Sequence, residues 1–215
     1  MTAANTPTNT AARAETRLAI IADDPDFFSS VARLLGDNGY DVITFTSPLA
    51  FRQSSSGNPP DVLVVALGEH ASDRLGLLEQ LENHEPRPVV VMISRHGDIA
   101  SSVRAMRAGA VDVLEESCDD DALLAAVARA ADRAHTIREI ARQEAIIRAR
   151  WETLTPRERE VSNFVIEGHL NKQIAAALGT TEKTVKVHRA RAMAKMQAHS
   201  IVELLRMLDR LGADR

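Results

Sequence analysis

Short apolar runs alternate with helix-like runs along residues 17–135 of this 215-residue chain, and this alternation limits the possible folds more than any other feature. The strand-like runs are residues 18–22, 41–45, 61–67, 89–93 and 110–114. In the third run, DVLVVAL, six apolar residues follow one aspartate without a break. Strands that are apolar on both faces belong to parallel sheets covered by helices on each side. The alternation therefore predicts an α/β unit with a five-stranded parallel sheet.

Helix signals occur between these strands. We expect one helix with a cap near Asp26 and an end at residues 36–39, and a short helix opened by Ser47 and Pro48. Further helices are expected near residues 75–81 and 98–108, and Asp119 should start the last one. Five strand–helix units predict the doubly wound, flavodoxin-like fold, whose binding sites lie at the carboxyl ends of the strands.

Residues 121–150 contain no glycine or proline and are rich in alanine, arginine and glutamate. This composition predicts one long helix. Ile140, Ile147 and Leu154 are spaced by seven residues, so two copies of the chain could pair along it as a short coiled coil. The alternative is a single amphipathic helix packed on its own chain, because Glu144 interrupts the apolar stripe.

Residues 154–196 carry the signals of three short helices in close succession. Thr155, Pro156 and Glu158 form a start signal with a hydroxyl cap, a proline and a carboxylate that reaches back. The second helix should open near Asn171, whose side chain can cap it, and end at Gly179 in a left-handed turn. A third helix follows at once. Two helices joined by so short a turn predict a helix-turn-helix, whose second member enters the DNA major groove.

The third helix is strongly basic. Between residues 183 and 195 it holds five basic residues and no acidic one: Lys183, Lys186, Arg189, Arg191 and Lys195. Val185, Ala192 and Met196 share an inward stripe, which leaves Lys186 and Val187 outward and the two arginines on the flanks. Such a face can contact base edges and phosphates together. The alternative, a solvated basic helix, is disfavoured by the helix and glycine turn that precede it.

Charge is distributed unevenly along the chain. Residues 151–215 hold 11 Lys and Arg against 8 Asp and Glu, a net charge of +3. The totals are 26 and 30, so residues 1–150 hold 15 basic and 22 acidic residues, a net charge of −7. Only the second part therefore favours nucleic acid.

Composition argues against several other classes. The single Cys118 excludes an internal disulfide framework and, without a Cys/His cluster, argues against a structural zinc site. No apolar run reaches about 18 residues, so we expect no membrane span and a cytoplasmic protein. Residues 1–16 are small and polar and lack the apolar core of a signal peptide, so we expect a disordered lead.

Several segments of the C-terminal part together resemble the DNA-binding domain of the LuxR/FixJ family of bacterial transcription regulators. They are LTPRERE, NKQIAAALG, TTEKTVKVHRA and the exit AKM followed by a serine. The resemblance implies that Lys186 and Val187 approach bases. It also implies that Lys172, Thr184 and Lys195 approach phosphates.

A fourth helix is expected after residue 200, with an apolar stripe of Ile201, Leu204, Leu205 and Leu208. In the LuxR/FixJ family the corresponding helix mediates dimerisation on DNA. The resemblance therefore implies a homodimer with two-fold symmetry on an inverted-repeat site in double-stranded DNA.

The first part of the chain resembles a response-regulator receiver domain. Asp23 and Asp24 follow the first strand, RHGD follows the fourth, and AGAVD accompanies the fifth. A receiver before a LuxR-type domain is the order of NarL-type two-component response regulators. The implied organisation is a lead at 1–16, a receiver at 17–134, a helical linker at 135–150 and a DNA-binding domain at 151–215.

The receiver resemblance also reveals a missing phosphate acceptor. In the family the third strand reads PDVxxxDL, whereas here it reads PDVLVVAL, so Ala66 stands at the acceptor position and has no oxygen to phosphorylate. Glu116 stands at the position of a phosphate-binding lysine, and Val113 at that of a switch aromatic residue. We interpret Asp23, Asp24, Ala66, Ser94 and Glu116 as a degenerate phosphoacceptor site. Without the third carboxylate, the acid pair is expected to cap a loop, and neither a metal nor a cofactor is expected.

These features predict a DNA-binding transcription regulator that acts as a dimer and does not use aspartyl phosphorylation. Its active arrangement would be set by dimerisation, by another protein, or by a ligand at the receiver. The alternative is an interaction module whose pseudo-receiver sequesters a kinase or another regulator. We do not expect this protein to be an enzyme, because the sequence shows no nucleophile–base pair, metal cluster or phosphate-binding loop.

Overall fold

The computed structural model describes residues 16–54, 59–67, 76–77, 81, 87–94 and 99–212. The chain forms two compact units, which divide between Arg138 and Glu139. The predicted lead lies outside the described residues except for Thr16, which is buried. The loop RHGD and most of the helix expected near residues 75–81 also lie outside them.

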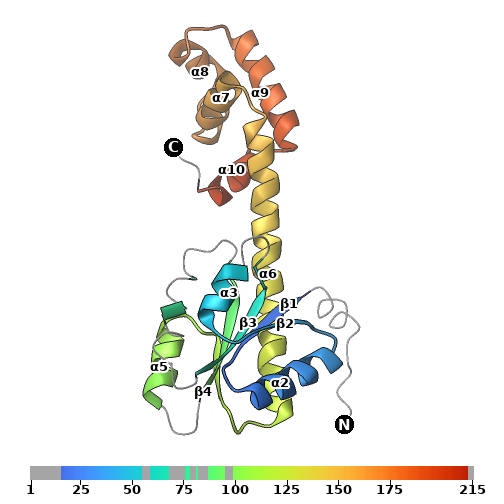
Figure 1. Cartoon of the computed structure of the whole chain (residues 1–215). Coiled ribbons are helices and arrows are strands. Elements are labelled where there is room, and N and C mark those ends of the chain that lie inside the picture. The colour runs from blue at the N-terminus through green and yellow to red at the C-terminus, as the bar shows by residue number, and fades with distance from the viewer. Residues whose placement is uncertain are drawn as a thin grey trace, which may run out of the picture. The chain divides into compact units, whose positions relative to one another are not determined.

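Five parallel strands form the sheet of the first unit (Figure 1). They are β1 (Arg17–Ile21), β2 (Asp41–Phe45), β3 (Val62–Leu67), β4 (Val89–Ser94) and β5 (Asp112–Glu115). Their order is β2-β1-β3-β4-β5, and every neighbouring pair is parallel. The predicted five-stranded, flavodoxin-like sheet is therefore confirmed.

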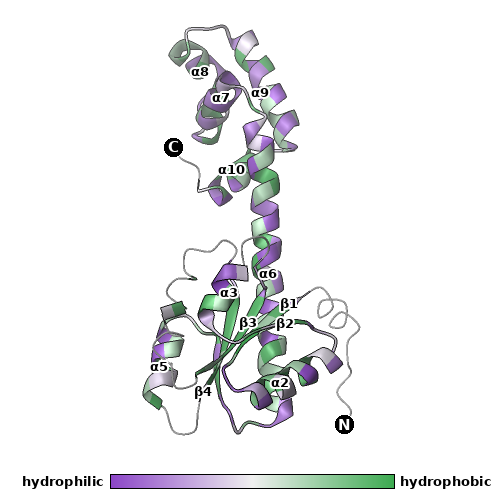
Figure 2. Ribbon diagram, viewed as in Figure 1, coloured by the Kyte–Doolittle hydropathy of each residue, from purple (hydrophilic) through white to green (hydrophobic). Residues whose placement is uncertain are grey.

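Helices cover both faces of this sheet. α2 (Pro25–Asp37) and the first half of α6 (Asp120–Glu152) pack on one face, and α3 (Pro48–Ser54) and α5 (Ile99–Arg107) pack on the other. The strands between these layers are mostly hydrophobic along their length (Figure 2). All six residues of β4 are buried, as expected of a central strand covered on both faces.

The long helix α6 confirms the prediction made from the absence of glycine and proline. It has 33 residues, about 50 Å at 1.5 Å per residue. The side chain of Asp119 accepts the backbone N–H of Ala122 at 2.7 Å, which caps its start as expected. Its first part buries an alanine-rich stripe in the core of the first unit, made of Leu123, Ala126, Val127, Ala130, Ala131 and Ala134.

The second unit contains the end of α6 and four shorter helices. These are α7 (Pro156–Ile166), α8 (Asn171–Ala177), α9 (Glu182–Met196) and α10 (Ile201–Arg210). α7 begins with the predicted capping box, in which Glu158 accepts the backbone N–H of Thr155 at 2.9 Å and Thr155 accepts that of Glu158 at 3.2 Å. The predicted helical fold of this part is confirmed. Among the described helices of the chain, none is long and apolar enough to span a membrane.

Candidate functional site

The predicted helix-turn-helix is present in the second unit. α8 and α9 are joined by residues 178–181, and Gly179 has the left-handed φ of 61° expected of the residue that ends a helix. The hydroxyl oxygen of Thr181 accepts the backbone N–H of Thr184 at 3.2 Å and so caps α9. This turn gives the second helix a separate start and an independent direction.

The start of α8 differs from the prediction. Asn171 is the first helical residue rather than the cap, and Leu170 occupies the cap position. Leucine has no side-chain acceptor, so the side chain of Gln173 accepts the backbone N–H of Leu170 at 2.8 Å instead. The side chain of Asn171 is thereby available to Arg189 of α9, whose Nη1 lies 3.5 Å from its Oδ1.

α9 buries one face and exposes another, as its spacing predicts. Val185, Ala192 and Met196 are at most 1% exposed. Lys186 lies on the exposed side next to Val187, which is 43% exposed although it is apolar. An exposed valine beside a lysine suits a groove surface that meets both methyl groups and hydrogen-bond acceptors of bases.

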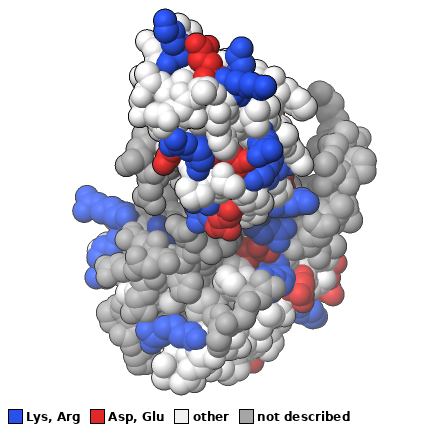
Figure 3. Space-filling view, turned by 90° about the horizontal axis from the view of Figure 1, so that it is seen from above, with Lys and Arg blue, Asp and Glu red and all other residues white. Residues whose placement is uncertain are grey.

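The other residues predicted to contact DNA surround this face, and their side chains differ in exposure. Lys172 of α8 and Arg191 of α9 are exposed, whereas Thr184 and Arg189 are half-buried. In Figure 3, which shows the molecule from above, Lys and Arg side chains lie among Asp and Glu side chains and uncharged surface rather than in one merged basic field. This pattern agrees with the modest net charge of +3 on residues 151–215.

Lys195 has a different environment from the one predicted for a phosphate contact. Its ammonium group donates to the buried carboxylate of Glu158 at 2.6 Å and to the carbonyl oxygen of Thr153 at 3.0 Å. The Lys195 side chain is 35% exposed and that of Glu158 only 3%. Lys195 thus forms an ion pair within its own unit, and its contact with phosphate stays a prediction. Sequence reasoning missed this pair, since 37 residues separate its members.

The ion pair with Lys195 changes the pKa of the Glu158 carboxyl group. Hydrogen bonds from Lys195 and from the backbone of Thr155 lower the pKa of this carboxyl group below its ordinary value, against the opposing effect of burial. Glu158 is therefore an anion at neutral pH, held between α7 and α9.

The predicted degenerate site is only partly assembled in the first unit. Asp23, Asp24, Ala66 and Glu116 line one cavity at the carboxyl ends of the strands, together with Phe27. The cavity volume is about 10 Å³, so it has room for no more than about one water molecule.

Asp24 acts as the capping residue that the sequence suggested for the acid pair. Its carboxylate accepts the backbone N–H groups of Asp26 and Phe27 at 2.9 and 3.3 Å, so Asp24 caps α2 in place of the predicted Asp26. Among the described residues, no group of three His, Cys, Asp or Glu side chains is placed to hold a metal ion.

Ser94 does not face the small cavity. Its hydroxyl donates to the carbonyl oxygen of Leu114 at 3.3 Å and lies 3.4 Å from the hydroxyl of Ser102. It lines a separate, open groove of about 510 Å³ between α5 and β5, together with Val113. The structure therefore groups four of the five residues of the predicted site and separates Ser94 from them.

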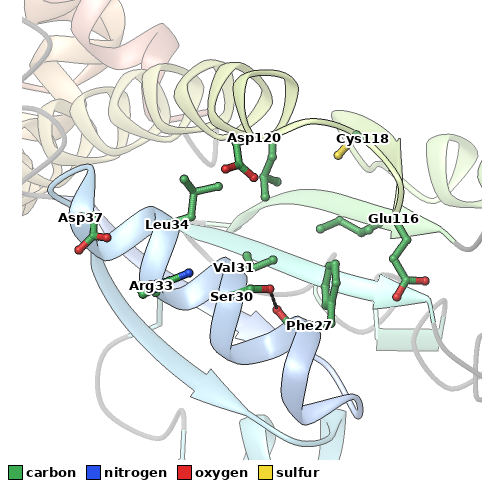
Figure 4. Close-up of a pocket in the computed structure, with 11 residues that line it drawn as sticks. Phe27, Ser30, Val31, Arg33, Leu34, Asp37, Glu116, Cys118 and Asp120 are labelled. Carbon is green, nitrogen blue, oxygen red and sulfur yellow. Dashed lines mark hydrogen bonds between the residues drawn. The ribbon is translucent and has the colours of Figure 1, made fainter.

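A larger cavity of about 520 Å³ lies beside the small one, between α2 and the residues that lead into α6 (Figure 4). Arg33, Asp37, Glu116 and Asp120 give it a charged rim, Cys118 adds a thiol, and its floor is apolar. Burial, then the neighbouring Asp119, raises the pKa of the Cys118 thiol, which disfavours the reactive thiolate. Sequence reasoning missed this cavity, because it depends on how α2 packs against α6.

The predicted dimerisation surface requires a correction. Leu204, Leu208 and Ile147 are 1%, 2% and 5% exposed and belong to the core of the second unit, so they cannot contact a partner. Of the remaining residues, Ile201 and Ile140 are 38% and 54% exposed, and Leu205 is half-buried. The apolar spacing alone could not distinguish a core stripe from an interface stripe.

A receiver-type sheet followed by a helix-turn-helix with a basic and partly apolar outer face defines a DNA-binding response regulator. Comparison with known protein families supports this class of protein. Residues 18–128 match the response regulator receiver domain, and residues 152–208 match the bacterial regulatory proteins of the luxR family. The chain belongs to the luxR-type response regulators, and it is a transcriptional regulator rather than an enzyme.

Similar proteins extend over nearly the whole chain. Nodulation protein W of Bradyrhizobium diazoefficiens is 38% identical over 196 residues, which cover 90% of this chain and 85% of that protein. The transcriptional regulatory protein FixJ of Rhizobium meliloti is 36% identical over 188 residues, covering 87% and 92%. Among solved structures, response regulator StyR is similar with a TM-score of 0.77 and 30% identity, covering 91% of this chain and 99% of that one.

Proposed function

We propose that this protein is a sequence-specific transcription regulator whose activity does not depend on aspartyl phosphorylation. The observation that supports this most directly is Ala66 at the carboxyl end of β3, where it lines a cavity of about 10 Å³ with Glu116 and the acid pair Asp23 and Asp24. A side chain without an oxygen cannot accept a phosphoryl group, and a carboxylate at the position of a cation repels one.

A phosphodonor experiment tests this independence. The protein is incubated with acetyl phosphate and Mg²⁺, and its intact mass and DNA affinity are measured before and after. We expect both to stay unchanged. A peptide carrying a phosphorylated aspartate would refute the proposal.

We propose that DNA is bound by the outer face of α9 and the start of α8, where Lys186 and Val187 approach bases. The flanking contacts to phosphates are proposed for Lys172, Thr184, Arg189 and Arg191. The exposed Val187 beside Lys186 supports this assignment, because an apolar side chain in the major groove can contact the methyl group of thymine.

Selection of DNA sequences from genomic fragments with the unmodified protein tests the interface. We expect an inverted repeat to be enriched without a phosphodonor. Lys186→Ala and Val187→Ala should each reduce discrimination against other sequences by about 1–3 kcal/mol. Arg206→Ala, on the exposed surface of α10, serves as the matched control and should leave the preference intact. Equal preference in all four proteins would contradict the assignment.

We further propose that the protein binds its site as a homodimer in the cytoplasm, with domains at 17–134 and 151–215 joined by a helical linker at 135–150. Ile201, Leu205 and Ile140 are the members of the predicted apolar set that retain exposed surface for such a contact. A single exposed isoleucine on a helix costs little stability. Several exposed apolar side chains that lie together can contribute to a dimer interface.

A second candidate function is an interaction module whose receiver sequesters a kinase or another regulator. The cavity of about 520 Å³ beside the small one favours it, because a charged rim around an apolar floor suits a protein or ligand contact (Figure 4). Capture of a cognate kinase without any shift of selected DNA would favour this function over transcription control.

A further inference from the structure

Within the second unit, the end of α6 packs directly on the recognition helix α9. Ile147 of α6 is buried in the same core cluster as Ala192 and Met196 of α9. One turn further on, Nη1 of Arg150 donates to the carbonyl oxygen of Met196 at 3.4 Å. The last turns of α6 therefore belong to the DNA-binding unit and contact the same end of α9.

Lys195 connects the helices of this junction through an ion pair and a hydrogen bond, which we call the Lys195 link. Its ammonium group contacts the carbonyl oxygen of Thr153, which follows α6, and the carboxylate of Glu158 in the first turn of α7. Glu158 also accepts the backbone N–H of Thr155 at 2.9 Å. One cation thus joins the end of α6, the start of α7 and the last turn of α9.

The surroundings of Glu158 make this link a strong constraint. A carboxylate that is 3% exposed is stable only when it is paired and hydrogen-bonded, so loss of Lys195 would leave an uncompensated buried charge. Together the two paired groups carry no net charge. A lysine held in such a pair releases few counterions from DNA and contributes little to salt-dependent binding.

We propose that Lys195 is a positioning residue, which fixes the recognition helix to the end of α6 and does not contact phosphate. Through this link the position of the end of α6 sets the angle at which Lys186 and Val187 meet the bases. The inference rests on the proposed function, because it assigns a role within DNA recognition. It also supplies a route by which a change in α6 reaches α9 without phosphorylation at Ala66.

The test compares Lys195→Met and Glu158→Gln with Lys172→Met, a variant that removes an exposed lysine of α8. Affinities for the selected sequence and for a scrambled sequence are measured over a range of salt concentrations. Lys195→Met and Glu158→Gln should each reduce the ratio of the two affinities by about tenfold, the cost of roughly one mismatched base pair. Lys195→Met should keep the salt dependence of the unmodified protein. Lys172→Met should instead lower the slope of log K against log salt by about 1.8, since the proposed dimer loses two contacts, and leave the ratio unchanged.

Two controls distinguish loss of the link from loss of the folded structure. The fluorescence of Trp151, the single tryptophan of the chain, reports whether each variant is folded. If Lys195→Met does not fold, the test relies on Glu158→Gln, which retains the shape of the side chain, and on Lys195→Arg, which retains the cation and should preserve the affinity ratio. The double variant Lys195→Met/Glu158→Gln should be no worse than either single one, because both changes break the same link.

An altered salt slope in Lys195→Met, together with unchanged discrimination in Glu158→Gln, would overturn the proposal and make Lys195 a phosphate contact. Amide hydrogen exchange provides a readout that needs no DNA. Glu158→Gln should speed exchange in residues 147–153 and 192–196, and unchanged exchange would equally overturn the link. If the unmodified protein prefers no DNA sequence, the proposed function fails, while the exchange result still decides whether the link exists.

Discussion

Ala66, the last residue but one of β3, lines a cavity with three acidic side chains, and these surroundings predict the effect of restoring a carboxylate there. An added carboxylate would lie close to Asp23, Asp24 and Glu116, which all carry the same sign of charge. Ala66→Asp should therefore destabilise the first unit by about 1–2 kcal/mol at neutral pH, and Glu116→Lys should recover part of this loss. Urea unfolding followed by circular dichroism measures both effects. Equal stability of the single variant and the unmodified protein would contradict the expected repulsion.

Single residues were predictable where their role depends on near neighbours in the sequence. The Thr155–Glu158 capping box follows from a spacing of three residues, and the loss of the acceptor at Ala66 follows from its place in a short motif. The pairing of Lys195 with Glu158 spans 37 residues, and it could not be predicted because many carboxylates are equally available to a lysine in the sequence alone.

At the scale of helices, the pairing of α7 with α9 predicts how the second unit responds to acid. The pKa of Glu158 is lowered in the folded protein, mainly because Lys195 donates to it, so its contribution to stability is fully present above the ordinary value of 4.5. This contribution is lost as the pH falls through the lowered value. Urea unfolding followed by Trp151 fluorescence should show Glu158→Gln to be less stable at neutral pH, by an amount that shrinks once the pH falls below 4.5. A difference that stays constant with pH would contradict the assignment.

The helices and strands were predicted from the sequence more accurately than the contacts between them. The absence of glycine and proline correctly predicted α6 as one helix, and the apolar runs correctly predicted the strands. The apolar stripe of α10 was assigned to a dimer, but Leu204 and Leu208 are buried within the unit. Amphipathic spacing shows that a helix has a partner surface, and it does not show whether that surface belongs to the same chain.

For the whole molecule, the boundary between Arg138 and Glu139 predicts that the end of α6 stabilises the second unit alone. Ile147 is 5% exposed in the core of that unit, so Ile147→Ala should destabilise it by about 2–4 kcal/mol, independently of protein concentration. Trp151 fluorescence should report this loss. The midpoint of the first unit, followed through a fluorophore attached to Cys118, should stay unchanged.

Ile140 is the matched control for this prediction, since it has the same side chain on the same helix but is 54% exposed. Ile140→Ala should change the stability of the monomer by less than about 0.5 kcal/mol. If α6 contributes to the proposed dimer, the same substitution should weaken self-association in sedimentation equilibrium, an effect that depends on protein concentration. A concentration-dependent loss in Ile147→Ala instead of Ile140→Ala would place Ile147 at the interface and would contradict the core assignment. The two isoleucines thus separate the role of α6 in folding from its role in assembly.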